Sequence, residues 1–205
     1  MKPGQLTFKV VQTPQGLPSS GQSLAVLLKD NWDDWGKYST LFVLIVFDEK
    51  AVRHNIGGVK IGQFRMPNEL RRPEVPTTFE SLDEAYFSLG QDDSYYKALG
   101  ELSETIRECI VKGLHDLVAD DGLWRQACDE DVTKISLLRS VTPKSVEGQF
   151  RRLLKGLPRL TGFKFTYTPP KNSNAHHLPY VLSFDVVPEA HPPTNLHVLI
   201  GRNGV

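Results

Sequence analysis

Residues 41–47 read Leu-Phe-Val-Leu-Ile-Val-Phe and form the longest purely apolar run in the chain. Seven residues are far too few to cross a bilayer, which takes about 20. A short run rich in β-branched and aromatic side chains is typical of a buried strand. The run therefore predicts a strand over Thr40–Asp48 and no membrane segment.

Three further strands are predicted around this run, and together they make residues 1–73 a β-rich N-terminal lobe. The predicted strands are Leu6–Gln12, Leu24–Lys29 and Ile56–Phe64. Glycine and proline punctuate the segments between them, as expected for turns. The start of the chain has no apolar stretch typical of a secretory signal, so we expect a cytoplasmic protein.

Residues 74–158 are predicted to be a helical segment. Its longest helix should begin at Asp92 or Asp93 as N-cap, after a polar turn over residues 88–94, and should end at Asp120-Asp121-Gly122. One apolar stripe supports this long helix, formed by Tyr95, Leu99, Leu102, Ile106, Cys109, Ile110, Leu114 and Leu117. A shorter helix is predicted over Trp124–Cys128, and another from Thr142-Pro143 to Gly156.

Residues 159–205 are predicted to hold two strands and a glycine-rich loop. Phe163–Tyr167 alternates ring and polar side chains, and Tyr180–Val187 is rich in β-branched and aromatic residues. A third apolar run then leads into Gly201-Arg202-Asn203-Gly204-Val205. A phosphate-binding P-loop consists of a strand, a glycine, four variable residues and Gly-Lys-Ser/Thr at the start of a helix. The first glycine and the four variable positions are present, and the chain ends where Gly-Lys-Ser/Thr would follow.

The Gly-x-Asn-Gly-x form of this loop resembles the nucleotide-binding loop of ABC-type ATPases, including the SMC/RecF/OLD-like ATPases. An antiparallel strand pair commonly precedes that loop in these ATPases. The wider chain resembles bacterial AAA/ABC-type ATPases with a long N-terminal extension, on segments 29–35, 58–62, 87–92, 136–140, 149–153 and 200–205. The alternative for the C-terminal strands is an ordinary β-meander.

The β-rich lobe, the helical segment and the C-terminal strands together predict an α+β chain. The resemblance implies that this chain is the N-terminal sensing or regulatory part of an ATPase, truncated inside the Walker A motif. It implies that Gly201, Arg202, Asn203, Gly204 and Val205 bind ATP phosphates, and that the intact parent uses ATP and Mg²⁺. It also implies a role in DNA transactions or antiviral defence. The chain alone lacks the loop lysine and the Ser/Thr, so we expect it to be inactive as an ATPase.

Two readings of the function stay open. In the first, residues 1–158 regulate an ATPase and the main partner is the remainder of the ATPase domain. In the second, the chain is a stand-alone binding module for a protein or nucleic-acid partner, without catalytic activity. A homo-oligomer is an open possibility in both cases.

The charges are segregated along the chain, although the net charge is zero. Residues 74–131 hold fifteen acids and four bases, whereas residues 134–171 hold nine bases and one acid. The basic segment makes Arg151, Arg152 and Lys155 candidates for nucleic-acid phosphate contacts. Alternatively, the basic segment and the acidic helices pack side by side or are solvated.

Other polar and aromatic motifs favour packing over chemistry. The tryptophans of Asn31-Trp32-Asp33-Asp34-Trp35-Gly36 could form a recognition loop, but are expected to fold back and cap the sheet. His176-His177 is expected in a solvated loop without metal. Cys109 and Cys128 are expected to be reduced and semi-buried. His115 is expected to pack beside the helical stripe, and no hydrolase constellation is recognisable.

Overall fold

The computed structural model describes residues 6–32, 34, 36–67, 69–168, 181–188, 190, 192 and 194–198. It has the α+β composition that the sequence predicts. The chain divides into two compact units, Met1–Pro158 (unit 1) and Arg159–Val205 (unit 2). Each unit is described separately below.

Unit 1 is built on a six-stranded sheet in the order β5-β1-β2-β3-β4-β6. β1 and β2 run parallel, and every other neighbouring pair is antiparallel. The strands are β1 (Thr7–Val11), β2 (Leu24–Lys29), β3 (Leu41–Phe47), β4 (Arg53–Gln63), β5 (Thr78–Phe79) and β6 (Tyr86–Gly90). The apolar run 41–47 is β3, which lies between β2 and β4 and is buried at every position except Val43.

The sequence predicts four of these strands and misses two. β6 replaces the turn that was predicted to begin at Ser88, because all five of its residues are buried and paired with β4. Its sequence, Tyr-Phe-Ser-Leu-Gly, contains two small residues that obscure a strand pattern. β5 spans only two residues, and such short edge strands carry almost no sequence signal.

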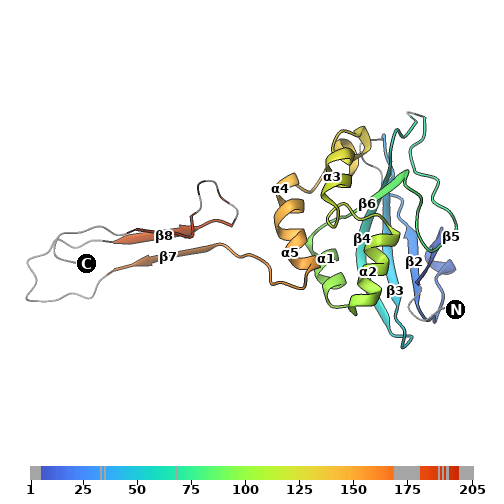
Figure 1. Cartoon of the computed structure of the whole chain (residues 1–205), viewed down its shortest axis with the longest axis horizontal. Coiled ribbons are helices and arrows are strands. Elements are labelled where there is room, and N and C mark those ends of the chain that lie inside the picture. Colours follow the sequence, from blue (N-terminus) through green and yellow to red (C-terminus); the bar gives the residue numbers. More distant parts are fainter. Residues whose placement is uncertain are drawn as a thin grey trace, which may run out of the picture. The chain divides into compact units, whose positions relative to one another are not determined.

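The helices of unit 1 follow β6 along the chain. They are α1 (Asp93–Gly100), α2 (Glu104–Gly113), α3 (Asp121–Ala127), α4 (Pro143–Ser145) and α5 (Arg151–Leu154). Figure 1 shows α1, α3, α4 and α5 beside β4 and β6 and α2 in front of the sheet. A short 3-10 turn, η1 (Pro14–Gly16), and two π-helical turns, η2 (Thr133–Leu137) and η3 (Val146–Phe150), complete the helical elements.

The single long helix predicted from Asp92 is wrong, because the chain breaks it into α1 and α2. Asp92 caps α1 as expected, and its side chain accepts a hydrogen bond from the Ser94 N–H. Gly100 ends α1 where a Cβ atom would lie 2.8 Å from the backbone oxygen of Leu153. Ser103 then caps α2. The predicted stop at Asp120 is also wrong, since Asp120 is the N-cap of α3.

One hydrophobic core joins the sheet and the helices of unit 1. It contains Phe8 and Phe42 from the strands, Ile110 from α2 and Phe150 and Leu153 near the end of the unit, all buried. Residues on both sides of the predicted division at 73/74 share this core and this sheet. A smaller cluster, formed by Val11, Val26, Ile45 and Phe47, lies apart from it.

Unit 2 contains the predicted strand pair, β7 (Phe163–Tyr167) and β8 (Leu182–Val186), in antiparallel register. Alternation along both strands places their apolar side chains on one face: Phe163, Phe165, Tyr167, Leu182, Phe184 and Val186. Phe165 and Phe184 stack with ring centroids 4.7 Å apart, while Lys164 and Asp185 pair on the other face. The rings of β7 are about half exposed, whereas the apolar side chains of β8 are partly buried and the His197 ring lies 5.0 Å from the ring of Phe184.

Several sequence predictions lie wholly or partly outside the described residues. These include Asp33, Trp35, His176, His177 and the glycine loop Gly201–Val205. The apolar run that leads to the loop is described only as far as Val198, and these residues belong to no strand.

Candidate functional site

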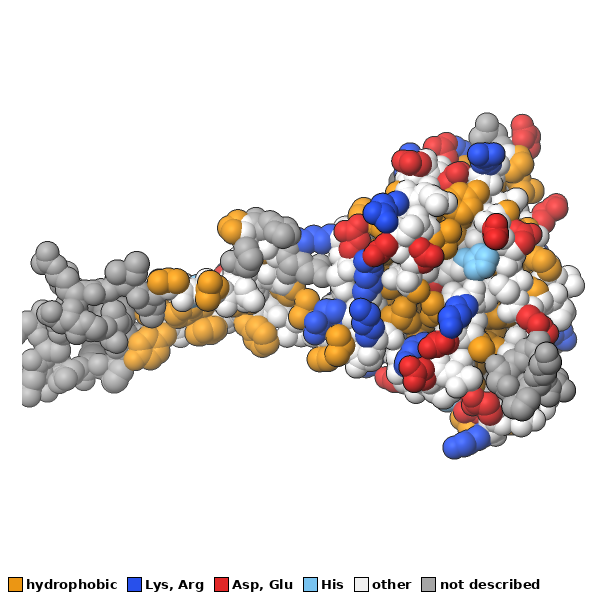
Figure 2. Space-filling model, in the orientation of Figure 1, with side chains coloured by type: hydrophobic (Ala, Val, Ile, Leu, Met, Phe, Trp, Pro, Cys, Tyr) orange, Lys and Arg blue, Asp and Glu red, His pale blue; other side chains and the backbone are white. Residues whose placement is uncertain are grey.

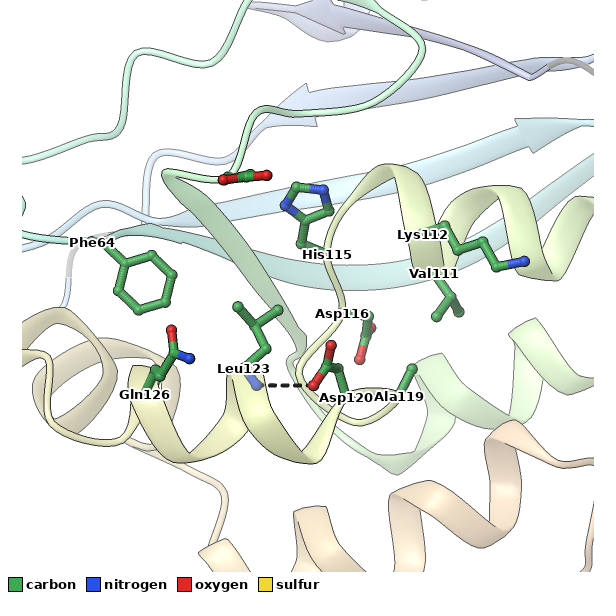
Figure 3. Close-up of a pocket in the computed structure, with 10 residues that line it drawn as sticks. Phe64, Val111, Lys112, His115, Asp116, Ala119, Asp120, Leu123 and Gln126 are labelled. Carbon is green, nitrogen blue, oxygen red and sulfur yellow. Dashed lines mark hydrogen bonds between the residues drawn. The ribbon is translucent and has the colours of Figure 1, made fainter.

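Unit 1 contains a pocket of about 690 Å³ beside α2 and α3, a volume typical of small-molecule sites. Figure 3 shows the side chains that surround it. The lining residues are Phe64, Glu84, Val111, Lys112, His115, Asp116, Ala119, Asp120, Leu123 and Gln126. Most of them come from the end of α2, the connection to α3, and α3 itself.

The connection between α2 and α3 is fixed firmly against β6. The end of α2 packs closely, because a Cβ atom on Gly113 would lie 2.7 Å from the Phe8 ring and 2.9 Å from the Glu80 oxygen. The Ser88 N–H then donates to the carbonyl of His115, and the Leu117 N–H donates back to the carbonyl of Ser88. These bonds hold Asp116 in a bridge with β6 and fix the direction of its side chain.

Asp116 is the most unusual group in the pocket, because its carboxyl is 2% exposed and has no basic partner among the described residues. Its Oδ1 accepts from the Val118 N–H at 2.9 Å and from the Tyr96 hydroxyl at 3.2 Å. Burial raises the pKa of Asp116 to about 7, and these two hydrogen bonds only partly oppose the shift. Burial also raises the pKa of Tyr96 well above its usual value, so Tyr96 stays protonated and remains a donor.

His115 and Asp120 each present one defined hydrogen-bonding atom. His115 Nδ1 lies 3.1 Å from the carbonyl oxygen of Tyr86. A carbonyl can only accept, so Nδ1 carries the hydrogen and Nε2 of the neutral ring is an acceptor. Asp120 uses Oδ1 to accept from the Gly122 and Leu123 N–H groups, the second of which is marked in Figure 3. Its Oδ2 makes no bond to the described residues.

Lys112 contributes little positive charge to the pocket. Its ammonium group forms an ion pair with Glu108 at 2.7 Å, and its side chain is 76% exposed. Figure 3 shows this group pointing away from Asp116 and Asp120. Acceptors therefore outnumber donors around the pocket, beside an apolar wall that includes Phe64, Val111 and Leu123.

This arrangement offers carboxyl and imidazole groups that can recognise a ligand. Within the described parts of the chain, no three His, Cys, Asp or Glu side chains are grouped closely enough to hold a metal ion. The pocket lining includes no serine, cysteine or threonine that could act as a nucleophile. Sequence reasoning placed His115 beside the helical stripe and assigned no role to Asp116. His115 and Asp116 line one pocket because α2 ends at Gly113 and both residues lie in the connection that follows.

The predicted nucleic-acid residues do not reach this pocket, which none of them lines. Arg151 and Arg152 lie on α5 and Lys155 follows it. Arg151 forms an ion pair with Asp121 of α3 at 2.5 Å, so here the basic and acidic segments lie side by side. Figure 2 shows acidic and basic side chains interspersed on the visible face of unit 1.

The sequence also missed a buried charge network. Asp34 is fully buried, pairs with Lys60 at 3.3 Å and with Arg139 at 2.8 Å, and accepts a hydrogen bond from Ser136. Burial would raise the pKa of Asp34, but the bonds from Ser136 and Arg139 and the charge of Lys60 outweigh it and lower the pKa. Trp32 is 53% exposed with the Arg139 guanidinium over its ring, so it does not cap the sheet as expected.

No helix in the described parts of the chain combines the length and apolarity needed to span a bilayer. Cys109 and Cys128 are half-buried and form no disulfide among the described residues.

The chain is similar to Protein ea59 of Escherichia phage lambda, with 35% identity over 200 residues. The match covers 97% of this chain but only 38% of the phage protein, so the chain spans less than two fifths of that relative's length. No family model matches the chain, and no solved structure matches it significantly.

Proposed function

We propose that unit 1 is a ligand-sensing module of a P-loop ATPase of the ABC type, and that unit 2 leads into the phosphate-binding loop of its catalytic domain. The observation that carries the sensing role is the pocket with Asp116, a buried carboxyl without a basic partner. Binding a group that compensates this carboxyl would change the hydrogen bonds of the α2–α3 connection, which is bonded to β6.

Unit 2 supports the link to an ATPase domain. Its exposed apolar face, with Phe163 and Phe165, needs a covering partner, because an isolated two-stranded pair is only marginally stable in water. The remainder of an ATPase domain would supply this cover. ATP and Mg²⁺ would bind to that domain at Gly201–Val205 and the residues that follow. The role in DNA transactions or antiviral defence implied by the resemblance is part of the same proposal.

The direct test of the ATPase link is the gene sequence after the codon for Val205. The proposal expects the next three codons to encode Gly-Lys-Ser or Gly-Lys-Thr. A continuation without these residues would overturn it. A second test is ATP turnover by the purified 205-residue chain. We expect none, because the groups that hold the outer phosphates and Mg²⁺ are not among its residues, and metal-dependent turnover would contradict the proposal.

A further inference from the structure

We infer that the pocket beside α2 and α3 binds a positively charged organic group, an ammonium or a guanidinium, carried on a short apolar stem. The role of the site rests on the proposed function. The ligand class rests on contacts within unit 1.

The first argument is the balance of charge around the pocket. Glu84, Asp116 and Asp120 contribute carboxyl groups, whereas Lys112 is paired outside the pocket with Glu108. An anionic ligand would meet like charges here. A cation would gain favourable interactions, which water weakens at the exposed Glu84 and Asp120 and which are strongest beside the buried Asp116.

The second argument is an acceptor atom with spare capacity on a side chain that is almost completely buried. Asp116 Oδ1 has two donors, but Oδ2 has only the Tyr96 hydroxyl at 3.3 Å, which is long for an O–H···O bond. That hydroxyl has a single hydrogen and lies at nearly equal distances from the two oxygens, 3.2 Å from Oδ1 and 3.3 Å from Oδ2. Oδ2 therefore shares its one weak donor and can accept from another, and buried polar atoms are normally satisfied.

The third argument is the position of further acceptors and of the apolar wall. Asp120 Oδ2 and His115 Nε2 are free to accept from a ligand with several N–H groups. Phe64, Val111 and Leu123 offer a surface for methylene groups next to these acceptors. A ligand group with several N–H donors and an apolar stem can bond to the acceptors and pack against the apolar side chains.

Binding of a cation at this site should strengthen as pH rises. Below about pH 7 Asp116 is mostly neutral, and above it the carboxylate can pair with the ligand. The groups around Asp116 are Tyr95 and Tyr96 of α1 and the pocket residues Glu84, Lys112, His115 and Asp120. Because Asp116 changes charge between pH 6 and 8, we expect affinity to rise about tenfold over this interval.

The test is a titration of the ¹⁵N-labelled 205-residue chain, followed through the amide signals of Val118, Gly122 and Leu123. The probes are spermidine, as a free polyamine, and a blocked Gly-Arg-Gly tripeptide, as a peptide side chain. Butanol serves as the uncharged control. We expect saturable shifts with one or both cations and none with butanol, and the better binder identifies the source of the cation.

Three variants separate binding in the pocket from general attraction by negative charge. Asp116→Asn removes the charge without changing the side-chain size, and should lower affinity about tenfold or more and abolish the rise with pH. Glu104→Gln removes one negative charge from an exposed position of α2 outside the pocket and should change little. Asp120→Asn keeps an N-cap for α3 and should weaken binding as well.

The inference is overturned if neither cation gives saturable shifts at about pH 8, or if Asp116→Asn binds as the unmodified chain does. If the Asp116→Asn variant fails to fold, the inference is tested by the affinity of the Asp120→Asn variant and by the pH dependence of cation binding to the unmodified chain. None of these results depends on ATP hydrolysis. Failure of the ligand class is therefore distinguishable from failure of the proposed ATPase link, which the downstream gene sequence tests.

Discussion

Two buried carboxyl groups of unit 1 are held in opposite ways. Asp34 lies among two cations and one hydroxyl donor, which compensate its charge. Asp116 has only a backbone N–H and a tyrosine hydroxyl. The first arrangement is that of a structural network, whereas the second leaves a carboxyl whose protonation responds near neutral pH.

Asp34→Asn should strongly destabilise unit 1. Lys60 is almost fully buried, and removal of the charge on Asp34 leaves its ammonium group uncompensated. Breaking such a buried pair costs about 3–5 kcal/mol of unfolding free energy, measured by urea denaturation. Asp131→Asn, which removes an exposed partner of Lys37, is the control and should lower the unfolding free energy far less. Equal effects of the two substitutions would contradict the structural role of the Asp34 network.

Asp116 should make the chain less stable as pH rises. Its folded-state pKa is raised from 3.8 to about 7, so the folded state holds the proton more tightly than the unfolded state. Stability from this group is therefore present at low pH and is lost as pH rises from about 4 to 7. The loss amounts to at most about 4 kcal/mol. Urea denaturation across this pH range should show that the Asp116→Asn variant does not lose this stability. If the unfolding free energy of the variant and of the unmodified chain changes with pH in the same way, the raised pKa of Asp116 is contradicted.

At the scale of elements, the end of α2 depends on a close approach to the sheet. Gly113→Ala would normally stabilise a helix, but here its Cβ meets Phe8 and the Glu80 backbone oxygen. We expect a loss of about 1–3 kcal/mol in unfolding free energy, because the neighbours cannot move freely. Glu104→Ala, on the exposed face of the same helix, should change stability by less than about 1 kcal/mol. An increase in stability for Gly113→Ala would show that the contact is absent.

The elements also show what the sequence could and could not predict. β3 and β7 follow from their apolar and alternating patterns, and the cap at Asp92 follows from its residue type. The break between α1 and α2 was missed because the apolar stripe from Tyr95 to Leu117 continues across it, although Gly100 at the end of α1 and Ser103 as the N-cap of α2 are ordinary stop and start signals. The pocket forms only because the chain breaks between its helices and folds back. The sequence around Asp116 and around Phe64 therefore contains no local pattern that predicts the pocket.

At the scale of the whole molecule, unit 1 should fold without unit 2. Its core extends no further along the chain than Leu153, and all of its strands lie before residue 91. We expect a fragment of residues 1–158 to unfold in urea within about 0.5 kcal/mol of the 205-residue chain. A larger loss of stability would mean that unit 2 contributes to the core of unit 1.

The basic residues at the end of unit 1 provide a separate test of the nucleic-acid reading. If Arg151, Arg152 and Lys155 contact phosphates, changing all three to Ala should lower affinity for every sequence. It should also flatten the slope of log affinity against log salt by about one unit per lost contact. Because Arg151 already pairs with Asp121, the substitution should also slightly destabilise the fold, which a melting curve would register. Salt-insensitive binding, or binding unchanged by the triple substitution, would leave this cluster as a structural partner of α3.

The central claim is that unit 1 senses a ligand for an ATPase domain and does not form part of its active site. The most direct measurement is steady-state ATP turnover of the longer protein that would contain this chain, with and without residues 1–158, in the presence and absence of the cation that binds the pocket. The account predicts that basal turnover survives the deletion while the response to the cation is lost. Loss of basal turnover from a core that remains folded, or an unchanged response to the cation, would contradict it.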